Sequence, residues 1–90
     1  MMYKMYTLYD SKTESYIPPF YAKANGDAIR QVSQVVNDPS SKQDFAKYPE
    51  DFTLFQIGAF DDAQGMVMPN SANENLGCLV NFKKSDTEMN

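Results

Sequence analysis

The chain has 90 residues, a mass of 10.2 kDa and a formal net charge of −4 at pH 7, and 42% of its residues are hydrophobic. This length suffices for one compact domain, so we expect residues 1–84 to form a single domain and residues 85–90 to be a flexible C-terminal tail. Without histidine and with a single cysteine, Cys78, the chain lacks the commonest general base and zinc ligand and cannot form an internal disulfide, and we expect no enzyme, cofactor or metal site.

The first predicted element is a strand over residues 2–8, where large apolar side chains occur on both faces. A second extended segment, residues 16–22, contains Pro18 and Pro19. Proline cannot donate a ladder hydrogen bond, so this segment is expected to lie at a sheet edge or to break there. One face of the first strand carries Tyr3, Met5, Thr7 and Tyr9, and the other carries Met2, Lys4, Tyr6 and Leu8.

One helix is predicted to begin at Asn25, a residue type that favours the N-cap, and to end before Pro39. Its apolar side chains recur at a spacing that forms a single stripe, and they are Ala28, Ile29, Val32, Val35 and Val36. Residues 40–51 are expected to be a loop with one helical turn, which Phe45 and Tyr48 would pin to the core.

The next predicted strand covers residues 52–60, and Gly58 within it indicates a bulge or a close backbone approach. Residues 61–65 suit a hairpin turn, after which residues 66–68 would pair back onto the strand. The remaining segments are an expected polar loop, residues 70–75, and an element over residues 76–82 that suits either a short helix or a strand.

This β-β-α-β-β order predicts an α+β fold, a four-stranded antiparallel sheet with one helix packed on one face and a short C-terminal element. A single helix covers only one face of such a sheet. The opposite face would therefore expose Tyr3, Met5 and Tyr9, or else Tyr6 and Leu8. Exposed apolar surface of this kind usually marks a partner or a ligand.

Aromatic and basic residues are interleaved in the first thirty positions. Proteins that bind single-stranded nucleic acid combine rings on which bases stack with cations that contact the backbone. An alternative is that these rings belong to the core and to a dimer interface. The candidate nucleic-acid-binding residues are Tyr3, Lys4, Tyr9, Lys12, Tyr16, Phe20, Lys23 and Arg30.

Several strings resemble the small non-structural protein of gokushoviruses, which are single-stranded DNA phages of the Microviridae. The resemblance covers about residues 2–68. The strings are Met5 to Lys12, Tyr16 to Phe20, Gly26 to Arg30, Val36 to Pro39, Tyr48 to Gly58 and Phe60 to Asp62.

The resemblance implies a protein made in the cytoplasm of the infected bacterium and not part of the mature virion. It also implies DNA binding and a likeness to the microvirus factor that switches synthesis from duplex copies to single strands for packaging. Together with the aromatic and basic residues above, it leads us to expect single-stranded DNA binding in this switch and in genome packaging. The alternative is an adaptor whose acidic stretch, residues 48–75, contacts a phage replication or scaffold protein. Under both hypotheses we expect a homo-oligomer, at least a dimer.

The sequence also gives no sign of a membrane partner. No stretch approaches the roughly 20 consecutive apolar residues that a spanning helix requires. Residues 1–5 lack the apolar segment of a secretory signal peptide, so we expect an intracellular protein.

Overall fold

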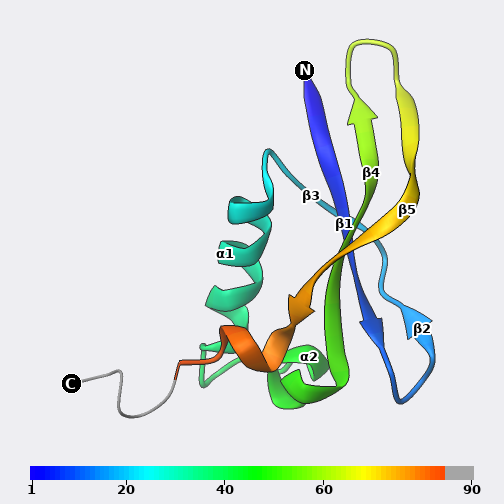
Figure 1. Ribbon diagram of the computed structural model, residues 1–90. Coiled ribbons are helices and arrows are strands. Elements are labelled where there is room, and N and C mark those ends of the chain that lie inside the picture. The colour runs from blue at the N-terminus through cyan, green and yellow to red at the C-terminus, as the bar shows by residue number, and fades with distance from the viewer. Residues whose placement is uncertain (85–90) are drawn as a thin grey trace.

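A computed structural model describes residues 1–84 (Figure 1). Its elements confirm the α+β class that the sequence predicts, and the expected C-terminal tail lies outside the described residues. Within residues 1–84, no helix is both long and apolar enough to cross a membrane. The elements are β1 (Met2–Asp10), β2 (Ser15–Tyr16), β3 (Phe20–Ala22), α1 (Asn25–Val36), α2 (Asp44–Lys47), the 3-10 helix η1 (Pro49–Asp51), β4 (Phe52–Asp61), β5 (Met66–Cys78) and the 3-10 helix η2 (Leu79–Phe82).

The sheet is antiparallel, with the strand order β2-β1-β4-β5, and β3 pairs with the same edge of β1 as β2 does. The second extended segment is broken between Tyr16 and Phe20, as its two prolines predict. Its first part pairs with the end of β1, where Tyr16 lies opposite Tyr9. Its second part pairs with the first half of β1, where Tyr21 lies opposite Met5.

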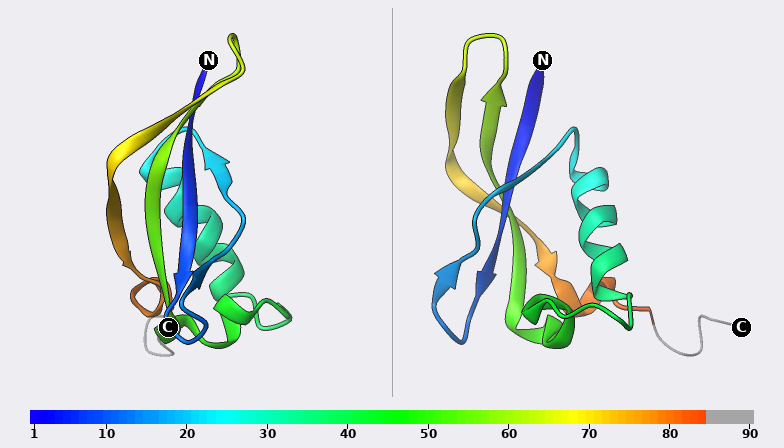
Figure 2. Two further views of the ribbon diagram at one scale, coloured as in Figure 1. Left: turned by 90° about the vertical axis from the view of Figure 1, so that its right-hand side faces the viewer. Right: turned by 180° about the vertical axis from the view of Figure 1, so that it is seen from behind.

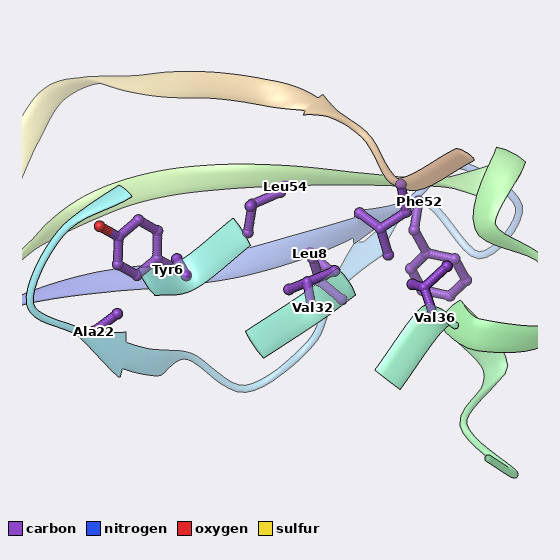
Figure 3. Close-up of a cluster of buried hydrophobic side chains, with 9 residues drawn as sticks. Tyr6, Leu8, Ala22, Val32, Val36, Phe52 and Leu54 are labelled. Carbon is purple, nitrogen blue, oxygen red and sulfur yellow. The ribbon is translucent and has the colours of Figure 1, made fainter. Parts of the chain in front are cut away.

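Helix α1 packs on one face of the sheet, and no helix lies over the opposite face in the part of the chain that the structure describes (Figures 1 and 2). Tyr6 and Leu8 of β1 are buried on the helix side, so the face of Tyr3, Met5 and Tyr9 is the one that α1 leaves uncovered. The expectation that this face exposes all three is wrong for Met5, which is buried, and Tyr3 and Tyr9 are only partly exposed. Figure 3 shows much of the core between the strands and α1. The core residues are Tyr6, Leu8, Ala22, Ala28, Val32, Val36, Phe52, Leu54 and Leu79.

Gly58 confirms the predicted bulge in β4. The register with β1 shifts there, because Tyr6 pairs with Gln56 whereas Met5 pairs with Gly58. A Cβ atom on Gly58 would lie 2.7 Å from the carbonyl oxygen of Met68, so the backbone of β5 approaches too closely for any larger residue. The residue between Gln56 and Gly58 has no partner in β1, and this extra residue reverses which face each later side chain of β4 points to.

Asn25 does not cap α1, contrary to the prediction. The N-cap is Ala24, which makes no side-chain capping hydrogen bond, and Asn25 is the first helical residue. Its Oδ1 atom instead accepts hydrogen bonds from the Tyr6 hydroxyl at 2.9 Å and from Gln56 Nε2 at 2.7 Å. A buried hydroxyl such as that of Tyr6 needs a hydrogen-bond partner, and this requirement outweighs the preference of asparagine for the N-cap position. Burial also raises the pKa of Tyr6.

Two further expectations are wrong. The polar residues 70–75 are not a loop but belong to β5, where Glu74 and Asn75 pair with β4. Cross-strand hydrogen bonds replace apolar contacts here, since Asn70 Nδ2 donates to the backbone oxygen of Gln56 at 3.2 Å. Tyr48 does not pin α2 to the core, because its side chain is 53% exposed, whereas Phe45 does pack against the core.

Candidate nucleic-acid interface

The face of the sheet opposite α1, here called the open face, gathers six aromatic rings. Tyr3 and Tyr9 occupy alternate positions of β1, and their cross-strand partners Phe60 and Tyr16 share their face. Because of the bulge at Gly58, residues of β4 that lie five positions apart point to the same side. The six rings belong to Tyr3, Tyr9, Tyr16, Tyr21, Phe55 and Phe60.

Three of these rings form a cluster at the β1–β2 end of the open face. The ring centroids of Tyr9 and Tyr16 are 4.9 Å apart, and those of Tyr16 and Phe55 are 6.3 Å apart. The Tyr16 side chain is 55% exposed, so solvent reaches this cluster directly. Rings held in mutual contact lose little further freedom when a ligand binds, which makes the cluster a preorganised stacking surface.

A second cluster lies toward the other end of β1. The ring centroids of Tyr21 and Phe60 are 6.1 Å apart, and Tyr21 is 46% exposed. Tyr3 lies directly opposite Phe60 on the neighbouring strand. Tyr3 and Tyr9 are separated by six strand residues, roughly 20 Å at 3.3–3.4 Å per residue. An extended ligand could therefore rest on both clusters at once.

Two of the four predicted cations lie at the ends of the open face. Lys12 is exposed in the turn between β1 and β2, where its backbone N–H donates to Asp10 Oδ1 at 2.9 Å. Lys23 is exposed and directly follows β3, next to the Tyr21 end. Each cation is thus near one ring cluster, where it could contact the phosphates of a strand whose bases stack on the rings.

The structure does not bring the other two predicted cations to this face. Lys4 lies opposite Ala22, which is buried on the helix side, and the alternation along β1 gives Lys4 the same side. Arg30 is an exposed residue of α1 itself. Both are separated from the open-face rings by the thickness of the sheet.

Phe20 also lies on the helix side, because its ring stacks on that of Tyr6 at a centroid distance of 5.8 Å and packs against the core. Conversely, the sequence list of candidates omits three open-face rings, those of Tyr21, Phe55 and Phe60. Alternation with Phe20 could have indicated Tyr21. The two phenylalanines are five positions apart, a spacing that places side chains on opposite faces of a regular strand. They share a face only because of the bulge, which their spacing in the sequence does not reveal.

Two adjacent acidic residues, Asp61 and Asp62, lie at the turn between β4 and β5. Within residues 1–84, no group of three histidine, cysteine, aspartate or glutamate side chains is placed to hold a metal ion. Asp62 accepts a hydrogen bond from the α-amino group of Met1 at 2.6 Å, and this contact raises the pKa of that amino group. Asp61 Oδ1 accepts a hydrogen bond from the backbone N–H of Ala63 at 2.9 Å, which supports the turn.

The family model described as Phage ORF5 protein matches residues 3–82. The chain belongs to this family. The chain is also 39% identical over 69 residues to Protein ORF5 of Chlamydia phage 1, a gokushovirus of the Microviridae, and the match covers 74% of this chain and 72% of that protein. No solved structure matches the chain significantly.

Membership of the phage ORF5 family confirms the resemblance to gokushovirus proteins that the sequence indicates. The matched range begins at Tyr3 and extends beyond Phe60, so it includes every ring of the open face as well as Lys12 and Lys23. The open-face rings therefore all lie within the part of the chain that matches the family.

Proposed function

We propose that this phage ORF5 protein binds single-stranded DNA on its open face. The observation that carries the proposal is a sheet face with six rings over which α1 does not pack, including the 55% exposed ring of Tyr16. Base stacking on such rings contributes about 1–3 kcal/mol per base and tolerates any sequence, because every base has an aromatic face. Lys12 and Lys23 would contact phosphates at the two ends.

We propose that this binding is non-catalytic and takes place in the cytoplasm of the infected bacterium. The protein would hold newly displaced or newly made single strands during the change from duplex replication to single-strand synthesis and packaging. Family membership supports a phage setting, and the open face supports an unpaired strand because its rings can stack only on bases that are accessible. A duplex would present its backbone to the rings instead.

The proposal predicts saturable binding of a fluorescently labelled oligothymidylate of about 20 nucleotides, which exceeds the roughly 4–16 nucleotides that one small domain covers. Fluorescence anisotropy should show affinity that falls as salt increases from about 50 mM to about 200 mM, since phosphate contacts release counterions. A matched duplex should bind more weakly.

An anisotropy signal that stays flat at about 50 mM salt would overturn single-stranded DNA binding. The adaptor hypothesis would then be tested by purifying the protein from infected cells with and without nuclease. Retention of a phage replication or scaffold protein after nuclease treatment, and its loss when Asp61 and Asp62 are replaced by asparagine, would favour the adaptor.

We also propose that the protein self-associates through the far end of the β4–β5 hairpin. Figure 1 shows this hairpin extending beyond the adjacent end of α1. Three apolar residues of this hairpin, Met66, Val67 and Met68, are 42–54% exposed. At the start of β1, which pairs with β4 at this end, Met1 and Met2 are 59% and 47% exposed. Isolated exposed apolar residues are ordinary, but several at one end of the sheet favour a symmetric contact with a second copy.

Light scattering should therefore return a mass of at least twice 10.2 kDa at high protein concentration. Replacing Met66 and Met68 with lysine should restore the monomer mass without unfolding the domain, because both side chains are exposed. A monomer mass for the unmodified protein at every concentration would contradict self-association.

A further inference from the structure

A large cleft lies far from the open-face rings, at the end of α1 where the chain leaves η2. It has a volume of about 1030 Å³ and lies between the C-terminal end of α1, helix α2 and the segment after η2. Figure 1 shows these three parts side by side at one end of the molecule. Three lysines line the cleft, Lys47, Lys83 and Lys84, together with Tyr48.

The cleft is a positive site in a protein of net charge −4. Asp38 is the single acidic residue that lines it beside the three lysines. The Asp38 carboxylate accepts hydrogen bonds from the backbone N–H and the hydroxyl of Ser40, at 2.9 and 2.7 Å. None of the three lysines forms a salt bridge with another residue among those described.

Asn37 fixes the backbone that carries two of these lysines. Its Nδ2 atom donates to the carbonyl oxygens of Ser33 at 2.8 Å and Phe82 at 3.0 Å, and its Oδ1 atom accepts from the N–H of Lys84 at 2.7 Å. The end of α1 and the segment that carries Lys83 and Lys84 are thus tied together by one side chain. Such support holds cationic groups near a fixed position, which lowers the entropic cost of binding.

One residue, Tyr48, lies between the cleft and the end of the sheet where Lys12 is found. Tyr48, whose ring is 53% exposed, lines both the cleft and a smaller hollow that Lys12 also lines. Lys12 lies in the turn that follows the Tyr9 end of β1. The hollow itself holds three carboxylates, Asp10, Asp44 and Asp51, so phosphates are expected on its two rims and not within it.

We propose that this cleft binds phosphate groups, and that in the complex it holds the backbone of the strand whose bases lie on the open face. This inference rests on the proposed function. It assigns Lys47, Lys83 and Lys84 to phosphates and leaves base stacking to the open face. The alternative role for lysines at this place is compensation of the partial negative charge at the C-terminal end of α1, which would require no ligand.

The test compares two double variants that change the net charge equally. Lys47→Gln with Lys84→Gln removes two cations from the cleft, and Lys4→Gln with Arg30→Gln removes two from the helix side. The readout is the slope of the logarithm of the oligothymidylate association constant against the logarithm of the salt concentration. This slope should become less negative by about 1.4 in the first variant, at about 0.7 per lost phosphate contact, and should stay unchanged in the second. An unchanged slope in the cleft variant overturns the inference while leaving the proposed function intact.

A second measurement separates the two proposals. Tripolyphosphate at constant ionic strength should cause saturable NMR shifts of the backbone amides of Asn37 and Lys84, and the cleft variant should abolish them. Failure of the unmodified protein to bind oligothymidylate would overturn the proposed function and with it the placement of a DNA backbone in the cleft. The cleft would then be judged as a phosphate site by these shifts. An absence of saturable shifts would overturn the phosphate site itself.

Discussion

Replacing Leu54 with alanine should lower the free energy of unfolding by about 2–5 kcal/mol, the range for removing a large aliphatic side chain from a core. Leu54 is fully buried in β4, within the cluster that α1 covers (Figure 3). A domain of this size has a total stability of only about 5–15 kcal/mol, so the variant should be close to unfolding. Urea denaturation followed by circular dichroism would measure the loss.

The adjacent position provides a matched control for the assignment of the two faces. Phe55 is the next residue of β4 and lies on the open face, where it is only partly buried. Phe55→Leu keeps most of the apolar volume and should cost about 1 kcal/mol or less. If Phe55→Leu were the more damaging of the two changes, the face assigned to the core would be the wrong one.

The sequence predicts the layers of this fold because its periodicities are strong. The stripe from Ala28 to Val36 correctly indicates the helix, and the alternation along β1 correctly separates Tyr3 and Tyr9 from Tyr6 and Leu8. Alternation alone leaves open which set faces the core. That choice depends on how α1 packs, which is a property of the whole chain and not of β1.

Other features depend on contacts between distant residues. Residues 70–75 read as a polar loop, yet they pair with β4 because Asn70 and Glu74 find polar partners in Gln56 and Asn25. Phe55 and Phe60 share a face only because the bulge at Gly58 inserts one residue between them.

The positions of the basic residues also depend on the packing of distant segments. Lys4 and Arg30 are close in sequence to the rings but lie on the helix side. Lys47 and Lys84 come from two segments, residues 31–47 and 81–90, in which positive and negative charges are equal in number, and they meet in one cleft. Local charge counts cannot reveal such a meeting, since it arises from the packing of η2 and α2 at the end of α1. The open-face rings were therefore partly predictable, and the cleft was not.

The second large expected effect is a loss of DNA affinity when open-face rings are removed. The double variant Tyr16→Leu with Phe55→Leu should weaken oligothymidylate binding by about 2 kcal/mol or more, roughly 30-fold, because it removes two rings of one cluster while keeping apolar volume. The control Tyr16→Phe with Phe55→Tyr keeps both rings and should bind within about 3-fold of the unmodified protein. Urea denaturation would verify that both variants are folded.

The most direct test of the account is the comparison of these two variants in one anisotropy titration at a single salt concentration. If bases stack on the open-face rings, affinity for the oligothymidylate should be lost in the leucine variant and retained in the phenylalanine–tyrosine variant. Equal affinity of the folded leucine variant and the unmodified protein would contradict it, because DNA would then bind somewhere other than the open face.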